Sequence, residues 1–178
     1  MKKMPLFYLC GTEGVGKSSI AKELIARNND TYVVLSGEIS NEPASPEQIG
    51  AVKRMWNDIC FDFSKQSGRS VILYNDSYIT DTGLTEEQLD DTHFITLFCE
   101  ESVLRQRFCK KWGDDANKKV GSNMTLLDLA IIRNKYYKEY YEEQNYKNMV
   151  LIDTTNMTVS EVAKQVFAYV QKQINEIK

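Results

Sequence analysis

Residues Gly11 to Ser18 read GTEGVGKS, so that a glycine and four further residues precede Gly-Lys-Ser. Glycines let a backbone curl so that successive N–H groups face an anion. A helix that starts at such a turn points its positive end at the same anion. The stretch matches the pattern GxxxxGK[ST] of phosphate-binding loops. We call residues 11–18 the phosphate loop.

The context of the phosphate loop strengthens this interpretation. The apolar run Leu6 to Cys10 before it is typical of a buried parallel strand, and residues 18 to 27 after it have the spacing of a helix. We predict that the loop binds ATP with Mg²⁺, with Lys17 at the β and γ phosphates and Ser18 as a metal ligand. We expect Lys17 to be exposed at the junction of loop and helix. The predicted nucleotide-binding residues are Gly11, Thr12, Glu13, Gly14, Val15, Gly16, Lys17, Ser18 and Ser19.

Outside the loop, short apolar runs alternate with helical patterns along the whole chain. Strands are expected near residues 6–10, 32–35, 71–74, 94–98 and 149–152, and helices near 18–27, 45–67, 102–112, 126–144 and 160–177. This alternation predicts an α/β fold of three layers, a five-stranded parallel sheet with helices on both faces. We expect one domain over residues 1–178. Residues 113 to 123 are polar and contain glycine, so we interpret them as a mobile loop.

Composition limits the classes of partner. The 178 residues are 42% hydrophobic and 26% charged, with a net charge of -3, so no global charge attracts nucleic acid or a membrane. No apolar stretch has the length of a membrane span. The four cysteines form no CxxC pair and are interpreted as reduced thiols of a cytoplasmic protein. We expect a small-molecule acceptor, no stable nucleic-acid or membrane partner, and a monomer or homodimer.

Two carboxylates follow predicted strands. Asp76 ends the third strand, where it could ligate Mg²⁺ together with Ser18; Asp81 is the weaker candidate. Glu38 follows the second strand and could accept a proton from an attacking hydroxyl. For Asp76 the alternative to the metal role is a polar residue in the turn that ends the strand, and Glu38 could equally be a solvated acid of the loop.

Arginines flank the predicted mobile loop. Arg105 and Arg107 fall on the helix before it, and Arg133 on the helix after it. Phosphoryl transfer needs positive charge over the phosphates, and a closing lid at about residues 110–123 would deliver it. The tyrosine-rich stretch from Tyr136 to Tyr146 is interpreted as a helix that packs one tyrosine face on the core.

Taken together, the phosphate loop, the strand order, Glu38 and the arginine-flanked loop resemble the P-loop kinases of small molecules, over essentially the whole chain. These include nucleoside monophosphate, thymidylate, shikimate and gluconate kinases. The resemblance implies ATP-dependent phosphoryl transfer, an acceptor-binding segment at about residues 38–68, and adenine packing against the loop after the last strand. Residues 75 to 81 look like the corresponding region of thymidylate kinases, but Asn75-Asp76 stands where that family has Asp-Arg. A nucleoside monophosphate and a non-nucleotide metabolite therefore both stay open as acceptors.

Other functions are weighed against this one. A GTPase switch needs Asn-Lys-x-Asp and Asp-x-x-Gly, whereas Asn134-Lys135 precedes two tyrosines and Asp76 precedes Ser77-Tyr78-Ile79. An ATP-binding module without transfer chemistry stays a second alternative. A nucleic-acid 5′-end kinase is disfavoured by the acidic net charge.

Overall fold

The computed structural model describes residues 4–27, 30–37, 45–75, 82–120, 123–144 and 148–177. The main sheet comprises β1 (Leu6–Cys10), β2 (Tyr32–Ser36), β3 (Ser70–Tyr74), β4 (Thr92–Phe98) and β7 (Met149–Asp153). The helices are α1 (Lys17–Ala26), α2 (Pro46–Ser67), α3 (Glu86–Asp90), α4 (Glu101–Trp112), α5 (Leu126–Gln144) and α6 (Val159–Ile177). The strand order is β2-β3-β1-β4-β7 and all neighbouring pairs are parallel, which confirms the predicted fold class.

The strand order determines where a ligand can bind. Central β1 pairs with β3 on one side and β4 on the other. The chain first builds β2 and β3 on one side of β1 and then β4 and β7 on the other side, so the connections part at the carboxyl end of β1. In open parallel sheets this parting creates a crevice that binds ligands. The phosphate loop follows β1 at this point.

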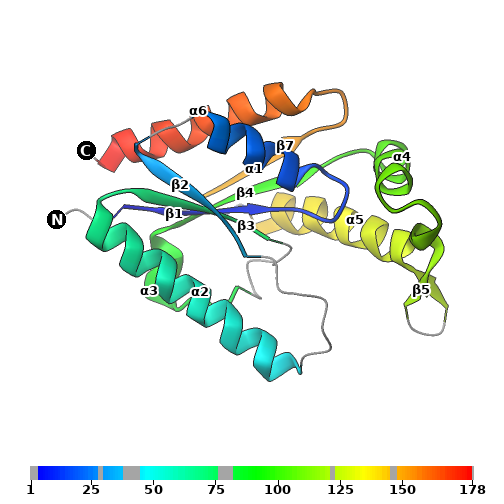
Figure 1. The fold of residues 1–178 in the computed structure, drawn as a ribbon, viewed down its shortest axis with the longest axis horizontal. Coiled ribbons are helices and arrows are strands. Elements are labelled where there is room, and N and C mark those ends of the chain that lie inside the picture. The colour runs from blue at the N-terminus through cyan, green and yellow to red at the C-terminus, as the bar shows by residue number, and fades with distance from the viewer. Residues whose placement is uncertain are drawn as a thin grey trace.

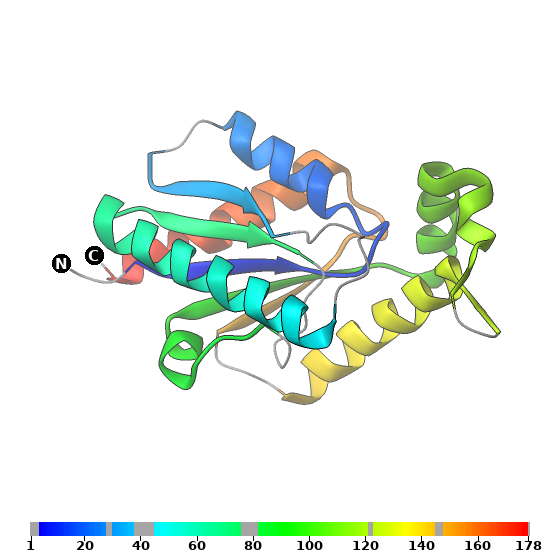
Figure 2. The ribbon, with the colours of Figure 1, turned by 60° about the horizontal axis from the view of Figure 1, so that its bottom comes forward.

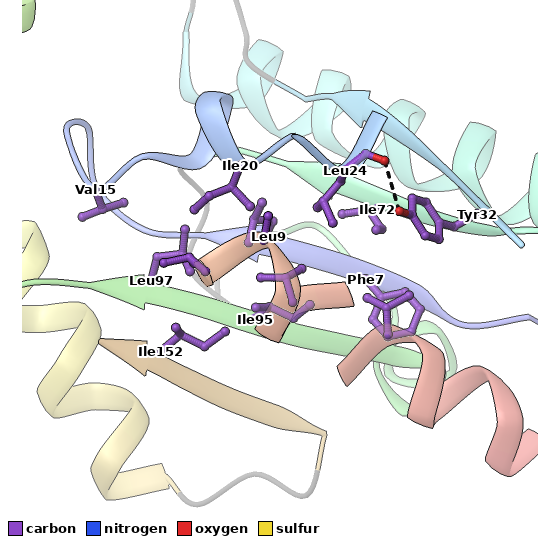
Figure 3. Close-up of a cluster of buried hydrophobic side chains, with 14 of the residues drawn as sticks. Phe7, Leu9, Val15, Ile20, Leu24, Tyr32, Ile72, Ile95, Leu97 and Ile152 are labelled. Atoms are coloured by element: carbon purple, nitrogen blue, oxygen red, sulfur yellow. Dashed lines mark hydrogen bonds between the residues drawn. The ribbon is translucent and has the colours of Figure 1, made fainter. Parts of the chain in front are cut away.

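Both faces of the sheet are covered, as predicted. Helices α1 and α6 lie on one face, and α2, α3 and α5 lie on the other (Figure 1). The stripe that α6 buries is Val162, Ala163, Val166, Val170 and Ile174, at helical spacing. Figure 3 shows Ile20 and Leu24 of α1 above Leu9 and Ile95 of the sheet. Val15 of the phosphate loop reaches the same cluster, so the loop is anchored in the hydrophobic core.

The tyrosine-rich part of α5 packs as expected. Tyr137 and Tyr141 are buried against the sheet together with Tyr8 and Phe94, whereas Tyr136 is 43% exposed. The interpretation of one tyrosine face on the core is therefore confirmed.

The region after α4 differs from the prediction. Residues Gly113–Asn117 form a 3₁₀ helix (η2), and β5 (Lys119–Val120) pairs antiparallel with β6 (Met124–Thr125). Ala116 of η2 is fully buried against Phe108 of α4 and against Leu127 and Ala130 of α5. One buried alanine in a polar run produces no periodic pattern, which is why the sequence indicated a mobile loop here. We call α4, η2 and the β5–β6 hairpin the arm; it lies beyond the carboxyl ends of the strands (Figure 2).

Two further findings complete the fold. The short helix α3 was not predicted; Thr85 and Gln88 form a capping box at its start. Among the described helices, none is both long enough and apolar enough to cross a lipid bilayer.

Candidate functional site

The phosphate loop lies very close to β4. Gly11 has φ 143°, and a Cβ atom there would lie 2.6 Å from the Leu97 carbonyl oxygen. Gly16, the N-cap residue of α1, has φ 107°, in the left-handed region that favours glycine. Glycine is therefore required at the start of the loop by close packing and at its end by backbone conformation.

The start of α1 differs from the starts of α2 and α3, and, unlike that of α4, it has no acidic residue in its first turn. Capping boxes close the starts of α2 and α3 with Ser45–Gln48 and Thr85–Gln88. Helix α1 has no side-chain cap at Gly16 and no acidic residue in its first turn. The backbone N–H groups of that turn therefore keep their positive field, which favours a bound anion.

Lys17 differs from the expectation. Its side chain is only 5% exposed, and its Nζ donates to the carbonyl oxygens of Gly11 at 2.8 Å and Thr12 at 3.0 Å. The prediction that Lys17 is exposed is therefore wrong, because the loop folds around its ammonium group. This arrangement places a fixed positive charge inside the loop, where phosphate oxygens would bind.

A pocket of about 580 Å³ runs from the phosphate loop to the start of α6. We call it the loop pocket. Its loop end is lined by residues Glu13 to Ile20, and its far end by Met157, Val159 and Val162. Val159 is 41% exposed although it is apolar. A pocket with a cationic end and an apolar end suits a phosphorylated molecule that also carries a flat apolar group.

Arg107 connects the wall of the loop pocket to the end of β7. Its Nη1 donates to the Thr154 hydroxyl at 2.9 Å, and its Nη2 donates to the Thr154 carbonyl at 2.8 Å. Thr154 in turn donates its hydroxyl to the Phe98 carbonyl at 3.1 Å. The guanidinium group is thus held in one orientation beside the pocket, with α4, β4 and β7 joined through it.

Arg133 approaches the phosphate loop from α5. Its Nη1 lies 3.2 Å from Oε1 of Glu13, and the Thr12 hydroxyl donates to Oε2 of Glu13 at 3.1 Å. Burial raises the pKa of Glu13, but a loop backbone hydrogen bond, Arg133, Lys17 and the Thr12 hydroxyl together lower it below the ordinary value. Glu13 is therefore a carboxylate at neutral pH and keeps Arg133 beside the loop.

Comparisons with known proteins show similarity in fold and none in sequence. No protein-family model matches the chain, and no curated protein matches its sequence. A gluconokinase from Sinorhizobium meliloti 1021 has a TM-score of 0.60 and 14% identity, over 99% of this chain and 97% of that one. The tunicamycin resistance protein of Deinococcus radiodurans has a TM-score of 0.58 and 16% identity, over 94% of this chain and 95% of that one. Thymidylate kinase from Candida albicans has a TM-score of 0.55 and 13% identity, over 97% and 93% of the two chains.

The chain has the fold of the P-loop small-molecule kinases. At this level of identity the likeness extends to the fold alone.

Of the residues predicted for the site, the phosphate loop and two arginines come together. Glu13 to Ser19 and Arg107 line the loop pocket, and Arg133 contacts it through Glu13. Arg105 lies elsewhere: its Nε donates to Glu101 at 2.8 Å, and it lines a second pocket. Glu38, Asp76 and Asp81 lie outside the described residues, so their roles stay predictions.

Of the two predicted Mg²⁺ ligands, Ser18 lies within the described residues. Ser18 lines the loop pocket and fits one Mg²⁺ ligand. Within the described residues there is no group of three histidine, cysteine, aspartate or glutamate side chains close enough to bind an ion. A Mg²⁺ ion at Ser18 would therefore depend on phosphate oxygens, as in other nucleotide sites.

The sequence analysis did not assign several residues of the pocket wall. Lys110 and Lys111 from the last turn of α4 line it, as do Thr154, Met157 and Val159. Lys110 stands three residues after Arg107, so helical periodicity could have placed it on the same face. For the residues after β7 no local pattern gave a signal, but the family resemblance did, since it implies adenine packing against the loop after this strand.

Proposed function

We propose that this protein is an ATP- and Mg²⁺-dependent kinase of a small molecule. The observation that carries the proposal is the loop pocket, in which a buried Lys17 and an uncapped helix end lie at one end of an apolar recess. Bound Mg·ATP would supply the phosphoryl group that is transferred. The chain's own residues would bind, orient and shield that group.

Each part of the loop pocket has a role in this proposal. The loop N–H groups and Lys17 would bind the β and γ phosphates, and the Ser18 hydroxyl would ligate Mg²⁺. The apolar recess at Met157 and Val159 would receive the base, in agreement with the resemblance described above. Arg107, fixed by Thr154, would offer its guanidinium plane beside that base. Lys110 and Lys111 would add positive charge over the phosphates.

Nucleoside monophosphates are the first acceptors to test. A gluconokinase and a thymidylate kinase share the fold with comparable TM-scores, so fold likeness does not choose between a metabolite and a nucleotide. Of the acceptor-binding segment predicted at about residues 38–68, the structure describes residues 45–68, and most of these residues form α2. The acidic net charge, -3, favours a small acceptor over a polynucleotide.

The test is a coupled assay of ADP release from ATP and Mg²⁺. Wild type is measured with each ribo- and deoxyribonucleoside monophosphate, and in parallel with gluconate, shikimate and other hydroxylated metabolites. We expect one class to raise ADP release at least tenfold above the rate without acceptor. A metabolite as the sole stimulant would replace the nucleotide proposal and preserve kinase activity. No binding of ATP by calorimetry would refute the function itself.

A further inference from the structure

We propose that Asn134 is a positioning residue that fixes Arg133 over the phosphate loop. The inference rests on the proposed function, because it assigns the Arg133 guanidinium to the phosphates of a nucleotide in the loop pocket. Asn134 itself is not among the residues that line the pocket, and its side chain bonds the backbone of Cys99. Its effect on binding would be transmitted through the neighbouring residue.

The first step is the place of Asn134 along α5. Leu127 and Ala130 of this helix belong to the cluster that packs η2 and α4 together. Further along, Tyr137 and Tyr141 belong to the cluster under the sheet. Asn134 lies between the two clusters and is a polar side chain that is only 7% exposed. Helix α5 therefore crosses from the arm to the body of the sheet at this residue.

The second step is what the Asn134 amide binds. Its Nδ2 donates to the Cys99 carbonyl at 2.7 Å, and its Oδ1 accepts from the Cys99 N–H at 3.3 Å. Both backbone groups of Cys99, just after β4 ends, are thus satisfied by one side chain. This two-point contact fixes the rotation of α5 about its axis as well as its position along the strand. A single apolar contact would fix neither so narrowly.

The third step links that contact to the loop. Strand β4 is paired with β1, with Cys10 opposite Thr96, so the end of β4 lies beside the start of the phosphate loop. Neighbouring residues of a helix project about 100° apart, so one can contact β4 while the next faces the loop. Arg133 does face it, with Nη1 3.2 Å from Oε1 of Glu13. The amide of Asn134 thus determines where the guanidinium of Arg133 lies.

The fourth step is the distribution of positive charge. Arg133 belongs to a part of α5 that is bonded to the sheet, whereas Lys110, Lys111 and Arg105 belong to the arm. Arg107 bonds α4 to Thr154, so a movement of the arm beyond Arg107 would change the distance of Lys110 and Lys111 from the loop. Asn134 would keep Arg133 in place during such a movement. When a nucleotide binds, its phosphate oxygens would replace the Glu13 carboxylate as the partner of Arg133, since both kinds of oxygen bind a guanidinium group through charge-assisted hydrogen bonds.

The experiment is a double-mutant cycle on nucleotide binding. We measure the affinity of Arg133→Ala, Asn134→Ala and the double variant for a nonhydrolysable ATP analogue with Mg²⁺, by calorimetry well below the melting temperature. Each single variant should bind about tenfold more weakly than wild type, the loss expected from one charge-assisted contact. The double variant should bind no more weakly than Arg133→Ala alone. Separate losses that multiply in the double variant would overturn the proposal.

Controls separate positioning from general destabilisation. Leu127→Ala removes a buried side chain from the same helix on its arm side, so it should lower the melting temperature and leave the affinity unchanged. If Asn134→Ala also lowers only the melting temperature, Asn134 is merely structural and the inference is wrong.

Asn134→Asp provides a second test if the alanine variant does not fold. It keeps the shape of the side chain and the oxygen that accepts from the Cys99 N–H. It should bind at least threefold more weakly than wild type, because it lacks the donor to the Cys99 carbonyl, and wild-type affinity would overturn the inference.

A variant of Lys17 tests the proposed function independently of the role of Asn134. Lys17→Met should abolish binding whatever the role of Asn134. If Lys17→Met binds like wild type, the assignment of the loop pocket fails and the inference fails with it. If Lys17→Met does not bind while Asn134→Ala binds like wild type, only the inference fails.

Discussion

Two pockets of similar volume lie on opposite sides of α4, and only one of them gathers the groups of a binding site. The loop pocket has about 580 Å³, and the second pocket, which we call the arm pocket, has about 630 Å³. The arm pocket is lined by Arg105, Val120, Asn123, Met124, Asp128, Ile131 and Ile132. Asp128 there is engaged in capping the start of α5, where it accepts from the N–H and hydroxyl of Thr125.

Pocket volume alone therefore does not identify a binding site. Arg105 and Arg107 are two residues apart on α4, and a helix turns about 200° over that interval, so they line different pockets. Arg107 is fixed by the hydroxyl and carbonyl of Thr154, whereas Arg105 forms an ion pair with Glu101 on an exposed surface. The loop pocket combines buried positive charge, backbone donors and an apolar recess, and the arm pocket lacks the first two among its described lining residues.

The largest effect that the comparison predicts is at Lys17. Lys17→Met keeps most of the side-chain volume and removes the charge, so phosphoryl transfer should fall about a thousandfold, the upper range for one electrostatic stabiliser. The Gly11 and Thr12 carbonyls would lose their donor, which costs about 1–3 kcal/mol of folding stability. A coupled assay and a thermal melt measure the two effects. A transfer rate near that of wild type would remove the functional distinction between the pockets.

The next largest effect concerns Mg²⁺. Chelation of the metal should abolish transfer, and Asp76→Asn should lower the rate at fixed Mg²⁺ on the order of a hundredfold, as removal of one electrostatic contribution does. Titration of the rate with Mg²⁺ measures this, with Asp81→Asn as the matched variant. If Asp81→Asn is inactive while Asp76→Asn keeps its Mg²⁺ dependence, then Asp81 is the metal-site carboxylate.

The features of the fold that could be predicted from the sequence are those that depend on a local pattern of residues. The phosphate loop, the five main strands and the long helices were predicted because glycine spacing and apolar periodicity lie within short windows. The burial of Lys17 was not, because it arises when the loop carbonyls fold back around its ammonium group. The η2 helix and the β5–β6 hairpin were not predicted for the same reason, since Ala116 is buried by residues of two separate helices.

The candidate site shows the same limit. The sequence placed Arg105 and Arg107 together as candidates, and only the packing of α4 against Thr154 distinguishes them. Asn134 entered the sequence analysis only as part of an absent guanine-reading motif; its role came from a contact with Cys99, 35 positions away. Long-range contacts of this kind leave no spacing in the chain to recognise.

A smaller effect is expected at Arg107. Arg107→Leu should raise the KM for ATP up to about tenfold, because the guanidinium beside the base is lost and a desolvated cation–π contact contributes on the order of 1–2 kcal/mol. The Thr154 hydroxyl and carbonyl would lose their donor, so the melting temperature should fall as well. Arg107→Lys should restore little of the affinity for ATP or of the melting temperature, since one ammonium group cannot reproduce the planar two-point contact with Thr154. An unchanged KM would mean that Arg107 serves the fold alone.

The pH dependence of stability provides a finer test of the loop pocket. The pKa of folded Glu13 lies below its ordinary value of 4.5, so the unfolded chain takes up its proton first as pH falls. The stabilisation by Glu13 is therefore complete above that ordinary value and is lost as pH falls through the lowered pKa. The melting temperature of wild type minus that of Glu13→Gln should be positive at pH 6 to 7 and shrink toward zero below about pH 4. In an Arg133→Met background the positive difference should be smaller, and equal differences would contradict the ion pair.

The smallest effect is expected at Arg105, which lines the arm pocket, and its size relative to that at Arg107 tests directly whether the two pockets differ in function. Arg105 is an exposed side chain whose partner Glu101 lies one helical turn before it, 2.8 Å away. Exposed pairs of this spacing contribute about 0.3–0.5 kcal/mol, because solvent screens the charges and both side chains lose conformational freedom. Arg105→Ala should therefore leave KM and kcat within about twofold of wild type, since about 0.3–0.5 kcal/mol corresponds to a factor of about two. Measured beside Arg107→Leu in one coupled assay, it compares two arginines from the same helix. A loss at Arg105 as large as that at Arg107 would show that the arm carries Arg105 to the nucleotide during turnover, and that the two pockets act as one site.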